Sequence, residues 1–288
     1  MSIQENTPPI TISSLWQQTG LRRWLLLMIV VGILLVMGFY AVTDGGYLQN
    51  DPILDGADWS SYALCHRITE RSFTINGRQF PLCARCSGMY LGVALVIMVM
   101  ILAGRMRRAL LPPLPLLLIL FAFIAIMGID GINSYSHFFP NAPHLYQPHN
   151  WLRLLTGMGT GVAMGLILLP ALAQSLWRSP QYHPIIGTKR ELTELLVLAV
   201  LTVLLLLSNQ SALLYVLALV SVAGLLFIVT ALNTIILLIH FRKDGRATSW
   251  KQTVVPLLTG FLFAVVQISI ISAVRLNLTG TMTGFPGL

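Results

Sequence analysis

Residues 65–103 read CHRITERSFTINGRQFPLCARCSGMYLGVALVIMVMILA. The segment Cys65–Gly88 holds all three cysteines of the chain, four of its eighteen Lys/Arg residues and the acidic residue Glu70. The uncharged apolar run that follows is long enough to enter a membrane. Reactive and charged side chains at a membrane boundary are costly unless they have partners. We therefore expect the functional centre to lie in Cys65–Gly88.

The composition is that of an integral membrane protein. The chain has 288 residues, of which 56% are hydrophobic and only 10% charged, whereas soluble domains average about 25% charged residues. A membrane-spanning helix needs about 20 mostly apolar residues, so we predict an all-α, polytopic bundle. The seven predicted spans are Trp24–Val42, Cys86–Ala103, Leu111–Ile129, Trp151–Leu172, Leu192–Leu207, Ala212–His240 and Thr253–Val274.

The basic residues predict the orientation. Twelve of the eighteen Lys/Arg residues flank the predicted spans on the side of the N-terminus, and six lie on the other side. The positive-inside rule therefore places the N-terminus in the cytoplasm and Cys65–Gly88 outside the cell membrane. The net charge of +8 comes from these short clusters. Because a nucleic-acid site needs a contiguous basic surface, we expect the lipid bilayer as partner and no nucleic acid.

The predicted spans divide the chain into four parts. Residues 1–23 form a cytoplasmic N-terminal segment, and residues 24–174 hold the first four spans with the outer site. Residues 175–276 hold the last three spans, and residues 277–288 form a tail. Within the outer site, Asn76-Gly77 is a strong turn signal that predicts a short hairpin before the cysteines. Glycines spaced four apart predict close helix packing in the second and fourth spans.

The Cys-x-x-Cys pair formed by Cys83 and Cys86 supports a metal site. Two thiolates at this spacing can hold one tetrahedral metal ion, and Cys65 with His66 would complete a Cys3His set. Thiolate ligands favour zinc, although copper(I) and iron also accept them. Adjacent residues point to different sides of a helix or strand, so His137 or Asp130 is an alternative fourth ligand to His66.

Two other uses of the cysteines remain open. Cys83 and Cys86 can form a reversible disulfide, with the thiolate favoured by a helix N-terminus and by Arg85. Cys65 would then serve as a resolving thiol. Alternatively, Cys65 can form a structural bridge to one of the other two cysteines in an oxidising compartment.

The charged residues predict a second feature of the site. Arg67, Glu70 and Arg71 have helical spacing, which favours an interfacial amphipathic helix with an Arg67–Glu70 ion pair. A functional interpretation is that arginines converge on an anion through bidentate hydrogen bonds. The predicted substrate-binding residues are Arg67, Arg71, Arg85 and Arg153.

An unpaired charge at the end of a span is expensive, so we predict that Asp130 pairs with Arg153 or shares a ligand with it. With a zinc ion that keeps an open position, Asp130 or Glu70 is the predicted catalytic base. Arg275, at the outer end of the last predicted span, is expected to reach the membrane interface.

Two segments together resemble a known family. They are Cys-His-Arg-Ile-x-Glu-Arg-Ser-Phe at Cys65–Phe73 and Pro-Leu-Cys-Ala-Arg-Cys-Ser-Gly at Pro81–Gly88. This pattern resembles the prokaryotic membrane proteins grouped as domain of unknown function 2085, as do Asp130-Gly131 and Asn150–Gly157. The resemblance extends from about Tyr62 to Gly165 and implies a polytopic protein, with no activity attached.

Three functions follow as hypotheses. The first is a membrane protein with a Cys/His zinc site at its outer face, which acts on a lipid or an anionic substrate. The second is a thiol–disulfide oxidoreductase that uses Cys83 and Cys86 with a quinone. The third is a binder or transporter of an anionic or lipid-linked small molecule, for which a cavity lined by the arginines would be the distinguishing observation.

Overall fold

The computed structural model of the protein describes residues 51–139 and 143–284. The first predicted span, Trp24–Val42, therefore lies outside the described residues, as does the N-terminal segment. The described chain is mainly helical, as predicted, with two small two-stranded sheets. Its elements are α3 (Pro52–Tyr62), the short 3-10 helix η2 (Thr69–Arg71), β1 (Ser72–Ile75), β2 (Arg78–Cys83), α4 (Ala84–Leu102), β3 (Arg108–Leu110), α5 (Leu114–Ser136), α6 (Asn150–Leu176), β4 (Gln181–Pro184), α7 (Lys189–Leu207), α8 (Ser211–His240) and α9 (Trp250–Thr279).

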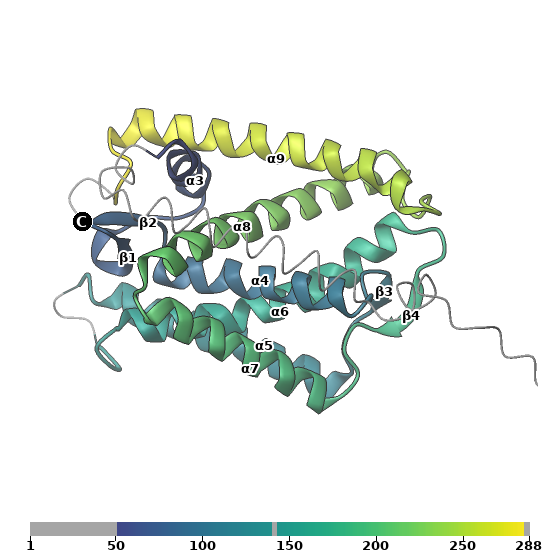
Figure 1. The fold of residues 1–288 in the computed structure, drawn as a ribbon, viewed down its shortest axis with the longest axis horizontal. Coiled ribbons are helices and arrows are strands. Elements are labelled where there is room, and N and C mark those ends of the chain that lie inside the picture. Colours follow the sequence, from purple (N-terminus) through teal and green to yellow (C-terminus); the bar gives the residue numbers. More distant parts are fainter. Residues whose placement is uncertain (1–50, 140–142, 285–288) are drawn as a thin grey trace, which may run out of the picture.

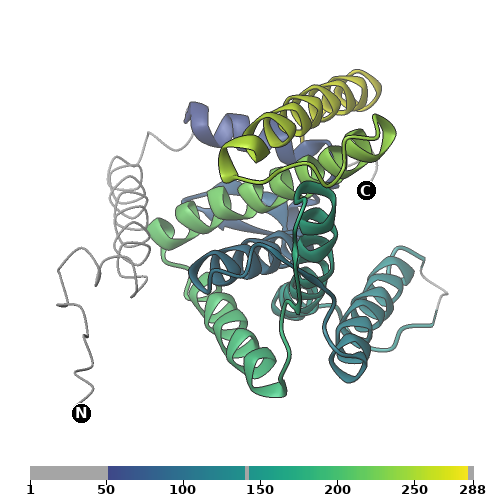
Figure 2. The ribbon, with the colours of Figure 1, turned by 90° about the vertical axis from the view of Figure 1, so that its right-hand side faces the viewer.

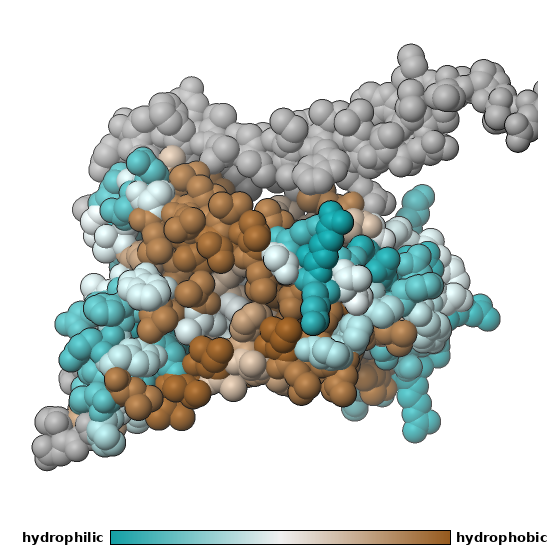
Figure 3. Space-filling model, turned by 90° about the horizontal axis from the view of Figure 1, so that it is seen from below, coloured by the Kyte–Doolittle hydropathy of each residue, from teal (hydrophilic) through white to brown (hydrophobic). Residues whose placement is uncertain are grey.

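Each of the six other predicted spans corresponds to one helix, from α4 to α9. Five of these helices are long and apolar enough to cross a membrane, namely α4, α5, α6, α8 and α9. The exception is α7, whose first six residues include Lys189, Arg190, Glu191 and Glu194. Figure 3 shows an apolar band across the middle of one face, with hydrophilic residues at both ends. This is the surface expected of a helical protein that sits in a bilayer.

Helices α4 and α6 form the centre of the bundle and pack closely along their length. Glycines make this contact possible, as the sequence predicts. A Cβ atom added to Gly157 would overlap the carbonyl group of Arg85, and one added to Gly161 would overlap that of Met89. The backbones of α4 and α6 therefore touch, which fixes the two helices relative to each other near Arg85 and Gly157.

The helices run back and forth, so the chain returns repeatedly to the same two ends (Figure 1). The β1–β2 hairpin and the start of α4 lie at one end, which we call the site end, with the ends of α5 and α9. Strands β3 and β4 pair at the opposite end. Ten basic residues lie in the loops and helix ends there: Arg105, Arg107, Arg108, Arg178, Lys189, Arg190, Arg242, Lys243, Arg246 and Lys251.

The predicted hairpin is confirmed. Strands β1 and β2 pair antiparallel, and the turn residues Asn76 and Gly77 have φ angles of 48° and 83°. Positive φ at both central positions is the geometry that Asn-Gly turns favour. Before the hairpin, α3 begins at Pro52, and the Asp51 carboxylate accepts the backbone N–H of Ile53 at 2.8 Å. This cap, with Pro52 at the first helical position, accounts for a short helix that lies outside the predicted spans.

Helix α5 stands to one side of the bundle (Figure 2), where it packs mainly on α6. Most of its surface is exposed in the isolated chain, including Leu118, Phe121 and Ile126. These side chains are suited to contact with lipid. Near its C-terminal end, however, Asp130, Asn133 and Ser134 are buried against the bundle. The apolar part of α5 thus faces outward, while its polar end forms a wall of the site.

Candidate metal centre and arginine pocket

The structure brings the three cysteines together. The Sγ atoms of Cys65, Cys83 and Cys86 all lie within 4.8 Å of one another. The Cys65 side chain is buried, the other two are half-buried, and all three are free thiols. Residues that are separated by up to 21 positions in the sequence thus form one cluster of sulfur atoms at the site end.

Three local features position the thiols. Cys65 follows α3 and donates its backbone N–H to the carbonyl of Ser61 at 2.9 Å. The Ser61 hydroxyl in turn donates to the carbonyl of Pro81 at 2.6 Å, which ties α3 to β2. Cys83 ends β2 and is the N-cap residue of α4, so Cys86 falls in the first turn of that helix. The Cys83 N–H donates to the Cys65 sulfur at 3.2 Å and joins the two segments directly.

The cluster favours a thiolate at Cys83. Hydrogen bonds from the Cys65 and Cys86 thiols, together with the positive charge of Arg85, hold the pKa of Cys83 well below its usual value. The hydrogen bond of Cys65 to Cys83, with burial, raises the pKa of Cys65 to about 12. Cys83 also lies at the N-terminus of α4, where the helix dipole favours a thiolate.

The predicted fourth ligands are not brought into this cluster. His66 is exposed and lies outside the group of sulfur atoms, because adjacent residues of an extended chain point apart. Asp130 is paired with Arg85, and the Nδ1 atom of His137 lies 2.8 Å from the carbonyl of Asn133. Within the described part of the chain, the candidate metal group consists of the three cysteines alone.

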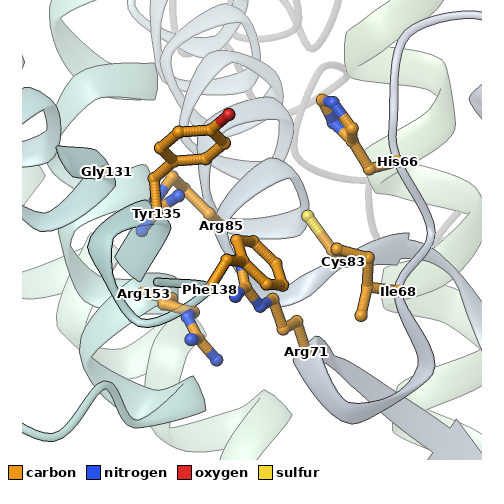
Figure 4. Close-up of a pocket in the computed structure, with 9 residues that line it drawn as sticks. All are labelled: His66, Ile68, Arg71, Cys83, Arg85, Gly131, Tyr135, Phe138 and Arg153. Carbon is orange, nitrogen blue, oxygen red and sulfur yellow. The ribbon is translucent and has the colours of Figure 1, made fainter. Parts of the chain in front are cut away.

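A pocket of about 470 Å³ opens beside the cluster (Figure 4). It lies between the segment before β1, the start of α4, the C-terminal part of α5 and the start of α6. Tyr135 stands on one side of the pocket, and His66 and Cys83 stand on the other. The lining residues are His66, Ile68, Arg71, Cys83, Arg85, Gly131, Tyr135, Phe138 and Arg153. The anion-binding hypothesis requires a cavity lined by arginines, and this pocket is lined by Arg71, Arg85 and Arg153.

Three arginines of the pocket converge on Ser134. Arg71 donates to its carbonyl oxygen at 3.1 Å, whereas Arg85 and Arg153 approach its hydroxyl oxygen at 3.0 and 3.5 Å. The three guanidinium groups come from three separate segments, and Arg153 is only 6% exposed. The sequence predicts their convergence, but nothing in it indicates that a serine of α5 is the meeting point.

The predicted Asp130–Arg153 pair is wrong, because Asp130 pairs with Arg85. Arg85 donates through Nε at 3.1 Å and through a second, shorter bond to the same carboxylate oxygen. The other oxygen accepts the Tyr146 hydroxyl at 2.7 Å. Burial and this bond to Asp130 raise the pKa of Tyr146 to about 12. Arg153 instead donates to the side chain of Asn150 at 2.8 Å.

The two predicted catalytic bases lie in different surroundings. Both carboxylate oxygens of the buried Asp130 are engaged, one by Arg85 and the other by Tyr146. Glu70 is exposed and does not line the pocket. Its backbone carbonyl accepts a hydrogen bond from Asn150 at 3.1 Å.

Arg67 lies apart from the other predicted anion-binding residues. It forms a salt bridge of 2.8 Å with Asp58, and Arg78 binds Asp55 and Asp58 at 2.7 and 2.8 Å. The predicted amphipathic helix with an Arg67–Glu70 pair is therefore wrong. Only η2 forms in this segment, since Arg67 has a φ of 51° and Ser72 already pairs with β2. Arg67 and Arg78 serve to fasten the hairpin to α3.

Arg275 supports the cysteine cluster from the far end of the chain. It lies on α9, and its guanidinium donates to the carbonyls of Tyr62, Cys65 and His66 at 2.6, 2.5 and 3.2 Å. Its Cζ atom also lies 4.1 Å from the centre of the Tyr62 ring. The expectation that Arg275 reaches the membrane interface stays a prediction, and its guanidinium engages carbonyls at the end of α3.

The fold and site define a multi-pass helical membrane protein with a thiol cluster beside a cationic pocket. The chain belongs to the family described as predicted membrane protein (DUF2085), whose pattern matches residues 65–167. An uncharacterised protein of Methanothermobacter thermautotrophicus is 31% identical over 104 residues, which cover 36% of this chain and 83% of that protein. An uncharacterised protein of Methanocaldococcus jannaschii is 28% identical over 115 residues, which cover 40% and 67% of the two chains. No solved structure gives a significant match.

The matched region contains every residue of the cysteine cluster and every arginine of the pocket. Helices α7, α8 and α9 lie outside it, and so does Arg275. The site therefore lies in the part of the chain that matches the family.

Proposed function

We propose that this membrane protein holds a zinc ion between Cys65, Cys83 and Cys86, and that the centre acts on an anionic or lipid-linked ligand at the outer membrane face. The observation that carries the proposal is the grouping of the three sulfur atoms within 4.8 Å, with Cys83 lining a pocket. Zinc is proposed because cysteine thiolates are its usual ligands in tetrahedral protein sites.

The spacing of the sulfur atoms suits a tetrahedral ion. Zinc–sulfur bonds of about 2.3 Å place neighbouring sulfur atoms about 3.8 Å apart. The observed limit of 4.8 Å is close enough that small side-chain rotations would close the site. The N–H···S bond between Cys83 and Cys65 supplies the kind of supporting contact that orients metal ligands.

The pocket gives the fourth coordination position a role. Since no further His, Asp or Glu of the described residues joins the sulfur atoms, this position would be taken by water or by a ligand from the pocket. A zinc ion with three protein ligands and an exchangeable position can polarise what binds there. The proposed centre is therefore suited to ligand exchange as well as to holding the fold together.

The outer-face location rests on charge. The end opposite the site carries the ten basic residues in loops and helix ends, while three arginines of the site end are paired with aspartates. The positive-inside rule counts basic loop residues, so it favours the cytoplasm for the end that holds β3 and β4.

The direct test is metal analysis of the full-length protein, purified without chelator. We expect about one zinc ion per chain, and we expect the Cys83→Ser and Cys86→Ser variants to lose it. Ser87→Ala, which changes a buried neighbour but no thiol, is the matched control and should keep the metal. Wild-type protein that is folded but contains no stoichiometric metal would exclude the zinc centre.

A second candidate function is thiol–disulfide exchange. It is favoured by the lowered pKa of Cys83 and by the position of this residue in the pocket. In this reaction the Cys83 and Cys86 thiols would give two electrons and two protons to a quinone, which leaves a disulfide and a quinol. Thiol trapping in intact cells distinguishes the two functions, because a zinc centre keeps all three cysteines reduced.

A further inference from the structure

We infer that the pocket beside Cys83 binds the phosphate group of its ligand as a dianion, held by Arg71 and Arg153. That this pocket is the ligand site of the zinc centre rests on the proposed function. That the arginines bind phosphate is inferred from the arrangement of their guanidinium groups and does not depend on the metal. The phosphate belongs either to a lipid head group or to a free phosphate compound, and the two share the same recognition chemistry.

The arginines of the pocket outnumber the carboxylates that pair with them. Three guanidinium groups meet at Ser134, and the only carboxylate that pairs with them in the described chain is Asp130, which is bound to Arg85. Neither Arg71 nor Arg153 has a carboxylate partner within 4.0 Å among the described residues. Two positive charges are therefore left without a direct counter-ion.

Burial makes this imbalance costly. Arg153 is more than nine-tenths buried, and its side chain lines the pocket. Burial and the neighbouring charge of Arg85 lower the pKa of Arg71. A thiolate at Cys83 and the exposed carboxylate of Glu70 offset part of this effect. Like charges that are held together in a half-enclosed site at a membrane boundary favour the binding of an anion.

The geometry favours phosphate over a single carboxylate. Each guanidinium has five N–H donors. Among the described contacts, Arg71 uses one donor on Ser134, and Arg153 uses two, on Ser134 and Asn150. The remaining donors can form the paired hydrogen bonds that tetrahedral oxyanions accept from arginine. Two uncompensated charges match a dianion, and a phosphate monoester carries about two negative charges near neutral pH.

The other lining residues indicate that the ligand is larger than phosphate. The pocket measures about 470 Å³, and Ile68, Tyr135 and Phe138 supply apolar or aromatic surface. The Phe138 ring also lies over the Arg71 guanidinium, 4.1 Å from its Cζ atom. This contact holds Arg71 in place while its hydrogen-bonding edge stays available. The pocket can therefore enclose the phosphate together with the organic group attached to it.

The test is a binding titration on the full-length protein in phosphatidylcholine nanodiscs, with inorganic phosphate as the first probe. We expect saturable binding that Arg71→Gln and Arg153→Gln each weaken by about 10- to 100-fold. Arg190→Gln removes an exposed positive charge at the opposite end and should leave binding unchanged. Since Arg153 is buried and its variant can misfold, the half-buried Arg71 provides the decisive variant, and Arg71→Lys separates the loss of charge from the loss of the planar group.

A second arm uses nanodiscs that contain phosphatidic acid, with bound lipids counted by native mass spectrometry. Retention of phosphatidic acid that depends on Arg71 identifies a lipid head group, whereas binding of inorganic phosphate without lipid retention identifies a free compound. Both arms are repeated after chelator treatment, because arginine-dependent binding without metal supports the inference even if the zinc proposal fails. Absence of saturable binding of either probe overturns it, as does binding that needs metal but ignores both arginine substitutions.

Discussion

The guanidinium group of Arg275 donates a hydrogen bond to the backbone carbonyl of Cys65 at 2.5 Å, across 210 positions of sequence. The same nitrogen binds the carbonyl of Tyr62, so one side chain of α9 holds the turn that presents the first cysteine. This position makes Arg275 a supporting residue of the proposed centre, and it gives the last helix a role at the site.

Replacing Arg275 with Gln is therefore expected to weaken zinc binding about 10-fold or more, as the loss of outer-shell partners does at other metal sites. The measurement is a zinc competition titration with a chromophoric chelator on purified protein. Arg275→Lys should give an intermediate value, because a point charge cannot bind the three carbonyls in the same way.

Arg246→Gln serves as the control for this substitution, since Arg246 is exposed at the opposite end of the bundle. Thermal unfolding of the zinc-free proteins separates a supporting role from a general loss of stability. If Arg275→Gln lowers the melting temperature of the zinc-free protein but leaves its zinc affinity intact, the supporting role is wrong.

The close packing of α4 and α6 gives a second prediction. Gly161→Ala places a Cβ atom against the backbone of Met89, where the neighbouring atoms cannot move aside cheaply. Overpacking of this kind costs about 1–3 kcal/mol, so we expect a clear drop in melting temperature. Gly128→Ala is the matched control, because a Cβ atom at Gly128 meets nothing within 4 Å. Equal melting temperatures for the two variants would contradict the close contact.

Most of the fold could be predicted from local sequence. Long apolar runs set the helices, since a bilayer leaves few other structures for the backbone. The Asn76-Gly77 turn set the hairpin, because both residues tolerate positive φ. Helix α7 shows where hydropathy becomes weak evidence of a span, because its first turns are charged. Helix α3 lies outside the predicted spans, and its start is capped by a single aspartate, Asp51.

The partners of charged residues could not be predicted in the same way. Sequence spacing predicts an Arg67–Glu70 pair. Arg67 binds Asp58 instead, because the segment continues into strand β1 and does not form the predicted helix. Asp130 was expected to pair with Arg153 or to share a ligand with it, yet it pairs with Arg85 of α4. Ion pairs between separate segments form only where the fold brings two side chains within a few ångströms. The periodicity of the sequence does not reveal these distances.

The Arg85–Asp130 pair supports a third prediction. Asp130→Asn leaves the Arg85 charge without its partner beside two other guanidinium groups, and breaking a buried pair in this way costs on the order of 3 kcal/mol. We expect a large fall in melting temperature, compared with a small one for Asp55→Asn, whose carboxylate is mostly exposed. The double variant Arg85→Met with Asp130→Leu should recover much of the lost stability, because it removes both charges at once. Direct pairing would be contradicted if the loss of stability in the double variant equals the sum of the losses in the single variants Arg85→Met and Asp130→Leu.

The orientation of the protein provides the last prediction. Helix α9 begins at the basic end of the bundle and finishes beside Cys65, so its C-terminal end lies on the same side as the site. We propose from the positive-inside rule that this side lies outside the cytoplasm. Alkaline phosphatase that is fused after Leu288 should therefore be active, because it folds only when exported, and green fluorescent protein at the same position should stay dark. Fusions after Lys243, in the loop between α8 and α9 at the basic end, should give the opposite pattern. A fluorescent C-terminal fusion with an inactive phosphatase would place the cysteine cluster in the cytoplasm, where the reducing environment would favour the zinc centre over disulfide exchange.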